Sequence, residues 1–193
     1  SHLELKQVFG INEYVTFDNW ESIYNQMNTY IENEKLSPRK LISRANVKFI
    51  GTTDNPLDSL EWHKKIAEDE TFDTVVAPTF RPDEAFISHA NFVRFVEKLE
   101  KLTDQKVNTF VDFMNALEER IKYFVQHGCK ASDISFGEIQ FRRASENELN
   151  DILQKVFKQE EITFEEVEKW QTEVFLKLCS LYKKYHLVTQ VHF

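Results

Sequence analysis

The chain has 193 residues, and its 32 Asp and Glu against 24 Lys and Arg give a formal net charge of −8. This negative charge argues against the phosphate backbone of a nucleic acid as the main partner. The hydrophobic fraction of 41%, which includes 17 Phe, is enough for one sizeable core or two small ones and argues against disorder. With only four Gly and four Pro, the composition favours a helix-rich chain with few flexible linkers.

The two cysteines, Cys129 and Cys179, are too few for a disulfide framework and lack the paired spacing of a zinc knuckle. No apolar run approaches the roughly 20 residues that a membrane helix needs, and no signal-like segment opens the sequence. We therefore expect a cytoplasmic protein that binds neither a membrane nor a nucleic acid.

Helix-start signals recur along the chain. The expected capping residues are Asp18, Ser37, Asn55, Ser145 and Thr163. The predicted helices cover residues 20–31, 40–45, 57–68, 91–102 and 108–126, and two more begin after Ser145 and Thr163, the last running to Tyr185. Apolar residues in 91–102 and 108–126 recur at helical spacing, which predicts that these helices each pack one face against a core.

Short apolar, β-branched runs lie between these helices and predict strands at 47–52, 74–79, 128–132 and 187–193. Strands that alternate with helices pair in parallel through right-handed crossovers, so the pattern predicts an α/β layer or barrel. Residues 1–45 hold two predicted helices and little strand signal, which predicts a helical insertion or subdomain. Residues 46–193 then form consecutive strand-helix units.

The sequence begins within a pattern of alternating apolar and polar residues and ends within a predicted strand. The first residues lack an initiator Met, and the last predicted strand stops without a turn signal or a polar tail. We expect a fragment of a longer chain. The alternative is an ordinary C-terminal strand that completes a sheet.

In a parallel sheet, ligands bind beyond the carboxyl ends of the strands. Arg81 follows the second predicted strand and is held by Pro82, so its guanidinium offers a rigid fork for a carboxylate or a phosphate. The alternative is an ion pair with Asp83 or Asp54 that only ties loops together. Asp83 itself fits a helix or loop cap better than an acid-base group.

Polar residues also follow the other predicted strands. Asp54 fits a helix cap and a site residue equally well, whereas Asp133 fits a cap better. Gln190 and His192 share one face of the last strand, where they could hold a metal or a substrate, although a lone His is more often structural. His63 lies within a predicted helix and is expected to be exposed or half-buried. Residues alone therefore predict an α/β site for a small anion and no particular reaction.

Several motifs in order along the chain resemble segments of the uronate isomerase family, also called glucuronate isomerase. They are His-Leu-Glu-Leu at 2–5, Gly-Thr-Thr-Asp-Asn-Pro at 51–56, Pro-Thr-Phe-Arg-Pro-Asp at 78–83, His-Gly-Cys-Lys-Ala-Ser-Asp at 127–133 and Gln-Val-His at 190–192. The resemblance covers essentially the whole chain.

The resemblance implies a distorted (β/α)8 barrel of the amidohydrolase superfamily, of which this chain is a part. The implied activity is aldose-ketose isomerisation of D-glucuronate to D-fructuronate and of D-galacturonate to D-tagaturonate, through a cis-enediol. It also implies a divalent metal, zinc above all. By their match to the family motifs, Arg81 contacts the substrate and His192 lies near the metal.

The family's His-x-His pair, its metal-binding Asp and its second substrate-binding Arg have no match in this sequence. The resemblance therefore implies that residues 1–193 alone bind no metal tightly and do not turn over a uronate. Ile134 also stands where the family commonly has His. Because part of a barrel leaves strand edges unpaired, we expect either self-association, with a homo-oligomer as one form, or repacking of part of the terminal strand.

Two other functions remain open from the sequence. One is a metal-dependent hydrolase of the same barrel superfamily, which would need a metal-activated water. The other is a carboxylate-binding or purely structural module without catalytic activity.

Overall fold

The computed structural model describes residues 2–87, 91–135 and 140–192. The chain divides into two compact units. One unit comprises residues 1–48 and 72–74, and the other comprises residues 49–71 and 75–193. None of the helices in the described ranges is long and apolar enough to cross a membrane.

The first unit contains three helices, α1 (His2–Phe9), α2 (Trp20–Asn33) and α3 (Pro38–Arg44). The sequence predicted only two, and α1 was missed because its eight residues carry no capping signal. The predicted cap of α2 was also wrong. Asn19 rather than Asp18 is the N-cap, and its side chain closes the preceding loop by accepting a hydrogen bond from the Thr16 backbone N–H at 2.7 Å. The Ser37 cap of α3 is confirmed by its hydrogen bond from the Lys40 backbone N–H.

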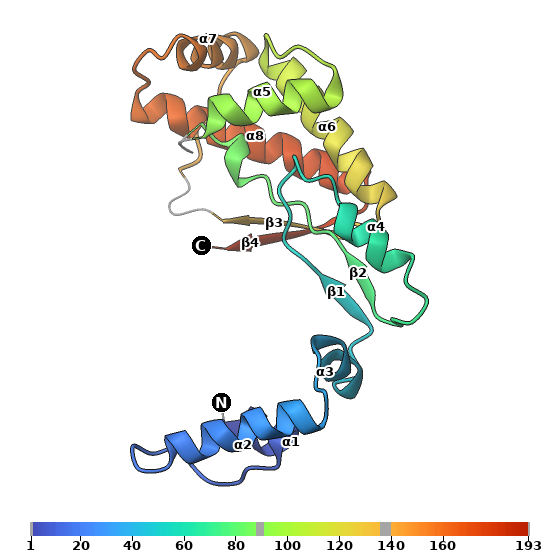
Figure 1. The fold of residues 1–193 in the computed structure, drawn as a ribbon. Coiled ribbons are helices and arrows are strands. Elements are labelled where there is room, and N and C mark those ends of the chain that lie inside the picture. Colours follow the sequence, from blue (N-terminus) through green and yellow to red (C-terminus); the bar gives the residue numbers. More distant parts are fainter. Residues whose placement is uncertain (1, 88–90, 136–139, 193) are drawn as a thin grey trace. The chain divides into compact units, whose positions relative to one another are not determined.

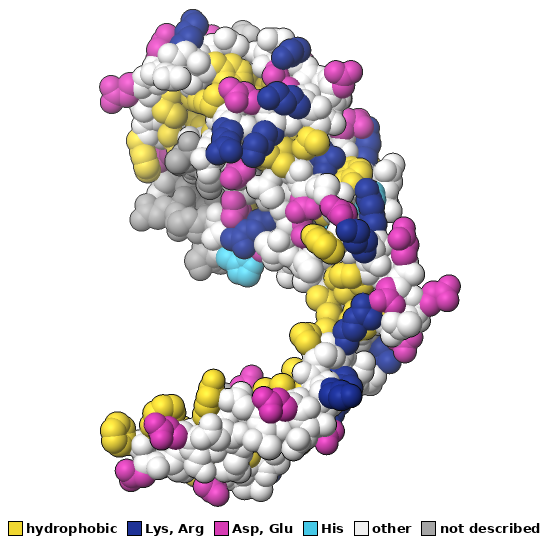
Figure 2. Space-filling model, in the orientation of Figure 1, with side chains coloured by type: hydrophobic (Ala, Val, Ile, Leu, Met, Phe, Trp, Pro, Cys, Tyr) yellow, Lys and Arg dark blue, Asp and Glu magenta, His cyan; other side chains and the backbone are white. Residues whose placement is uncertain are grey.

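Few apolar side chains of the first unit are buried. Leu5 and Ile23 are the buried hydrophobic residues among those described in residues 2–48. Phe17, by contrast, is 92% exposed, and Figure 2 shows several hydrophobic side chains on the surface of this unit.

The second unit is built on four short parallel strands, β1 (Phe49–Gly51), β2 (Val75–Ala77), β3 (Ala131–Ser135) and β4 (Val188–His192), seen in Figure 1. β1 pairs with β2 and β3 pairs with β4, both in parallel. Phe80 joins the two pairs, because it forms parallel bridges with Asp54 on one side and with Ser132 on the other. The strand ends of both pairs are therefore held in one continuous hydrogen-bonded series.

The predicted third strand was placed three residues too early. It runs from Ala131 to Ser135 instead of 128–132, because Gly128 has a positive φ of 87° and ends the preceding helix. Ser132 and Asp133 consequently lie within β3, not after it. The same element also places Ile134, which is fully buried, on the face opposite to Asp133.

The remaining helices are α4 (Glu61–Ala67), the 3-10 turn η1 (Asp83–Ala85), α5 (Phe92–Thr103), α6 (Phe110–Gln126), α7 (Glu146–Phe157) and α8 (Phe164–Lys184). α4 begins four residues later than predicted. The Asn55 side chain accepts a hydrogen bond from the Leu57 backbone N–H, which makes a local turn in place of a helix cap. Arg120 of α6 then holds this loop, donating to the carbonyl oxygens of Pro56 at 2.6 Å and Asp58 at 2.8 Å.

The core of the second unit lies among α5, α6 and α8, and it is rich in aromatic rings. Trp170 of α8 is fully buried, and its ring lies 5.4 to 5.5 Å, centroid to centroid, from Phe92, Phe110 and Phe113. Its indole N–H donates to the Ala85 carbonyl oxygen at 3.1 Å. The prediction that the apolar stripes of 91–102 and 108–126 face a core is confirmed.

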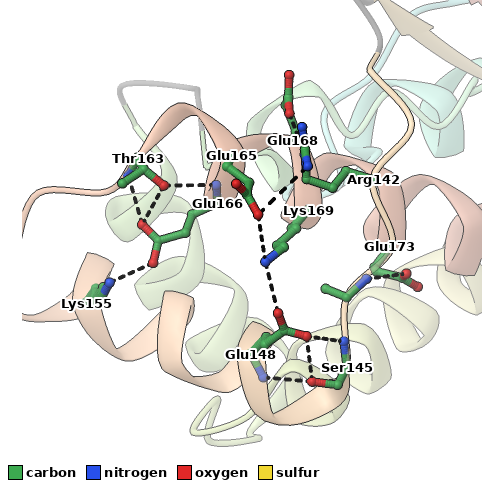
Figure 3. Close-up of polar contacts among 11 residues, drawn as sticks. Arg142, Ser145, Glu148, Lys155, Thr163, Glu165, Glu166, Glu168, Lys169 and Glu173 are labelled. Carbon is green, nitrogen blue, oxygen red and sulfur yellow. Dashed lines mark hydrogen bonds and ion pairs between the residues drawn. The ribbon is translucent and has the colours of Figure 1, made fainter.

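Two capping boxes open α7 and α8, as the sequence predicted, and Figure 3 shows them side by side. In each, a hydroxyl accepts from the backbone N–H of a Glu whose carboxylate accepts from the capping residue. Lys169 of α8 pairs with Glu148 of α7 at 2.9 Å, and Lys155 of α7 pairs with Glu166 of α8 at 2.6 Å. These partly exposed pairs align the two helices without adding much stability individually.

We expect Trp170→Ala to lower the free energy of unfolding by about 3 to 5 kcal/mol, because it leaves a cavity in the aromatic core. The matched control is Trp62→Ala, since Trp62 is 69% exposed and its loss should cost less than about 1 kcal/mol. Urea denaturation followed by circular dichroism measures both. Equal effects of the two substitutions would contradict this description of the core.

We expect Glu148 to titrate well below its ordinary value. The hydrogen bond from the Ser145 backbone N–H, with further contributions from Lys169 and the Ser145 hydroxyl, lowers the pKa of Glu148 from 4.5 to about 2. A lowered pKa stabilises the folded state above pH 4.5, and this contribution is lost as the pH falls towards 2. NMR titration of the Glu148 side chain measures it, and Lys169→Met should move the pKa part of the way back. An unchanged pKa in that variant would contradict the assigned contribution of Lys169.

Candidate functional site

The carboxyl ends of the four strands carry a set of charged side chains. Asp54 follows β1, Arg81 follows β2, Asp133 lies within β3 and His192 ends β4. Backbone hydrogen bonds bring these positions together, because Phe80 N–H donates to the Ala131 carbonyl oxygen and Asp133 N–H donates to the Phe80 carbonyl oxygen. This edge is where a parallel α/β sheet binds its ligands.

Arg81 contacts two carboxylates. Its Nε donates to Asp83 Oδ2 at 2.8 Å, and its Nη1 donates to Asp133 Oδ2 at 3.3 Å. The hydrogen bond to Asp83 raises the pKa of the Arg81 guanidinium, partial burial opposes this, and attraction to the charges of Asp83 and Asp133 adds to it. The side chain remains 36% exposed. Arg81 is therefore charged, oriented and accessible.

Asp133 links Arg81 to His192. Its side chain is only 9% exposed, and its Oδ1 lies 2.7 Å from Nε2 of His192. The strand register explains this contact, since Asp133 is paired with Gln190 and Ser135 is paired with His192 in the parallel β3-β4 ladder. One oxygen of this buried carboxylate thus accepts a hydrogen bond from a guanidinium, and the other lies 2.7 Å from an imidazole nitrogen.

The predicted ion pair of Arg81 with Asp83 is present, whereas Asp54 does not pair with its guanidinium. Asp54 instead reaches Arg81 through the backbone, because its carbonyl oxygen accepts from the Arg81 N–H at 3.0 Å. Asp83 also accepts from the Ser135 backbone N–H at 3.3 Å, which ties η1 to the end of β3. Arg81 forms this ion pair while its side chain remains accessible. A ligand-binding role and a role in tying loops together therefore do not exclude each other.

Sequence reasoning missed the central place of Asp133, which was expected to be a cap. The signal that could have revealed it is the period of two within β3. Ser132 and Ile134 are fully buried and face one side, and Asp133 therefore faces the other, towards the strand ends. The strand had to be placed at 131–135 before this alternation could be recognised.

The residues of the described ranges do not by themselves form a metal centre. No group of three or more His, Cys, Asp or Glu side chains in these ranges could hold a metal ion. His192 and Asp133 supply two neighbouring ligand types, which is fewer than the three protein ligands typical of a catalytic zinc site. A catalytic zinc at this edge of the sheet would therefore need at least one further protein ligand besides these two.

Comparison with known proteins identifies the family. The family model described as "Glucuronate isomerase" matches residues 1–193. The chain belongs to the glucuronate isomerase family. A protein named uronate isomerase from Streptococcus uberis is 58% identical over the whole chain, and one from Clostridium perfringens is 37% identical over the whole chain. The chain spans 41% of the length of each of these relatives.

Solved structures place the same fold in this family. The uronate isomerase from Thermotoga maritima is 28% identical and superposes with a TM-score of 0.90 over 99% of this chain and 42% of its own. The glucuronate isomerase from Caulobacter crescentus, at 23% identity and a TM-score of 0.86, shares the fold over 98% of this chain and 39% of its own. The predicted fold class, a helix-rich α/β chain that forms part of a (β/α)8 barrel, is confirmed.

Proposed function

We propose that this chain is a segment of a uronate isomerase that converts D-glucuronate to D-fructuronate and D-galacturonate to D-tagaturonate. The observation that carries the proposal is the contact of Asp133 with both Arg81 and His192 at the carboxyl ends of the strands. Family membership supports the reaction, and the geometry supports the placement of the substrate. The division into a helical subdomain of residues 1–45 and the strand-helix units of residues 46–193 is part of the same proposal and stays a prediction.

In this proposal, Arg81 binds the C6 carboxylate of the hexuronate. Its contacts with Asp83 and Asp133 use two of the five N–H donors of a guanidinium, and the exposed part of the side chain can offer the others to the substrate. The two acidic neighbours also keep the fork in one orientation, which lowers the entropy cost of binding. Arg rather than Lys suits this role because a planar fork can bind a carboxylate bidentately.

His192 lies at the reacting end of the sugar in this proposal. Isomerisation moves a proton between C2 and C1 through a cis-enediol, and this requires an acid and a base at that end. Asp133 Oδ1 lies 2.7 Å from the imidazole Nε2, and in this proposal the carboxylate orients the ring, as carboxylates do for functional histidines. We also propose that the complete enzyme is cytoplasmic, uses a divalent metal, zinc above all, near His192, and binds neither nucleic acid nor membrane. A homo-oligomer is its proposed assembly.

The test is a chimera in which this chain replaces the matching 193 residues of the Streptococcus uberis relative. Proton NMR of D-glucuronate in D2O should show conversion to D-fructuronate. Arg81→Ala should lower kcat/KM by about a hundredfold, because a half-buried charge contact is lost, and Arg81→Lys should recover only part of it.

Three controls define the outcome. The isolated 193-residue chain should leave the sugar unchanged, and a chelator should inactivate the chimera. Lys65→Ala, at an exposed residue of α4, should leave kcat/KM unchanged. A folded, metal-supplied chimera that leaves both uronates unchanged would contradict the proposed reaction, and binding of uronate without turnover would favour the carboxylate-binding module.

A further inference from the structure

A second polar cluster lies directly beside the end of β2. It consists of Thr52 and Asp54, which follow β1, and His63 of α4. Thr52 Oγ1 lies 2.6 Å from Asp54 Oδ2 and 2.7 Å from His63 Nε2, and the His63 Nε2 to Asp54 Oδ2 distance is 3.7 Å. The side chains of His63 and Asp54 are only 11% and 12% exposed. His63 is half-buried, which agrees with the expectation that it is exposed or half-buried.

Asp54 holds the backbone that presents Arg81. Its N–H donates to the Thr79 carbonyl oxygen at 3.0 Å, and its carbonyl oxygen accepts from the Arg81 N–H at 3.0 Å. Its carboxylate adds a third contact, because Oδ2 accepts from the Thr79 backbone N–H at 3.2 Å. Asp54 therefore fixes residues 79–81 through both its backbone and its side chain. The Asp54 carboxylate is thus attached to the same short segment that carries Arg81.

The single hydroxyl proton of Thr52 decides which side chains of the cluster donate hydrogen bonds and which accept them. Thr52 has one hydroxyl proton, and its shortest contact is to the carboxylate of Asp54, to which it donates. His63 Nε2–H then donates to Thr52 Oγ1, and the buried Nδ1, which has no hydrogen-bond partner in the described residues, is the unprotonated nitrogen. His63 thus donates to Thr52, and Thr52 donates to the carboxylate of Asp54. His63 and Thr52 together therefore hold this carboxylate in place.

The arrangement is not that of a nucleophile with its base. A Thr hydroxyl beside an imidazole can serve as one, but the carboxylate would then have to orient the imidazole through Nδ1. Here the carboxylate contacts the hydroxyl instead, and Nδ1 is buried without a partner among the described residues. The cluster therefore acts on the position of neighbouring groups and carries no chemistry of its own.

The loop that leads from β1 into α4 is held by a core helix. Arg120 of α6 is buried and donates to the carbonyl oxygens of Pro56 and Asp58, and Leu60, the N-cap of α4, has a positive φ of 54°. The loop between β1 and α4 is thereby fixed to a core helix. α6 therefore fixes the loop that precedes α4, and His63 of α4 contacts Thr52, which in turn contacts Asp54.

We propose that Thr52, Asp54 and His63 are positioning residues for Arg81, which set the place of the guanidinium that receives the substrate carboxylate. The proposal rests on the proposed function, because it needs Arg81 to bind a hexuronate. Loss of the cluster misplaces a binding contact remote from C1 and C2, so KM rises while kcat changes little.

The experiment uses the chimera with D-glucuronate. His63→Ala should raise KM about tenfold and change kcat less than about threefold, whereas His63→Gln, whose amide can still donate to Thr52, should restore KM to within about threefold. In the Arg81→Ala background, His63→Ala should have no further effect on kcat/KM, because the group that it positions is absent. The matched control is Lys65→Ala on the same helix.

The outcomes separate this proposal from the proposed function. An unsubstituted chimera without activity overturns the proposed function and this inference with it. In an active chimera, an unchanged KM in His63→Ala, or equal losses with and without Arg81, overturns the positioning role alone. If His63→Ala does not fold, Thr52→Val against Thr52→Ser gives the same test, because only Ser keeps the hydroxyl that contacts Asp54.

Discussion

The second unit depends on the backbone of one residue, Phe80. Its N–H and its carbonyl oxygen both pair with the strand of Asp133, and it bridges to Asp54 on the opposite side. Its ring is fully buried and packs edge to face on Phe124 of α6, with centroids 5.2 Å apart. Without these contacts the four strands would be two separate pairs. Because they exist, Asp54, Arg81, Asp133 and His192 share one edge of the sheet.

Local signals in the sequence predicted the helices well where a single residue satisfies the helix end. Ser145 and Thr163 open α7 and α8 as expected, because each is followed at the right spacing by a Glu that completes the capping box. Asn55 carries an equally good local signal and does not start a helix. Its side chain makes a turn, and Arg120, which is distant along the chain, holds the loop. Contacts at that distance cannot be predicted from local pattern.

The residues of the candidate site also differ in whether local sequence could reveal them. Arg81 could be singled out from its place after a strand and its neighbour Pro82, and its partner Asp83 is two residues away. Asp133 could not, because its role requires the register in which β3 and β4 pair. His63 was expected only to be exposed or half-buried and was given no role, since its contact with Thr52 depends on where α4 begins. Family resemblance named Arg81 and His192, and the geometry adds the carboxylate that connects them.

Acidic and basic side chains are mixed along this chain, whose formal net charge is −8. Figure 2 shows acidic and basic side chains interspersed over the face of the larger unit in view, without a field of one sign. At the strand ends, by contrast, a guanidinium and an imidazole lie on either side of one carboxylate. At this edge the Arg81 guanidinium lies between the carboxylates of Asp83 and Asp133, so an anion would have to contact the guanidinium directly and would not meet a surplus of positive charge.

In the proposed function, Asp133 acts by orienting Arg81, whose Nη1 it contacts. The most direct measurement is a double-mutant cycle in the chimera with Arg81→Ala, Asp133→Asn and the pair, using kcat/KM for D-glucuronate. We expect the double variant to lose at least about fivefold less than the product of the two single losses, because residues in contact couple. Losses that multiply would show that Asp133 and Arg81 act independently and would contradict this role of Asp133.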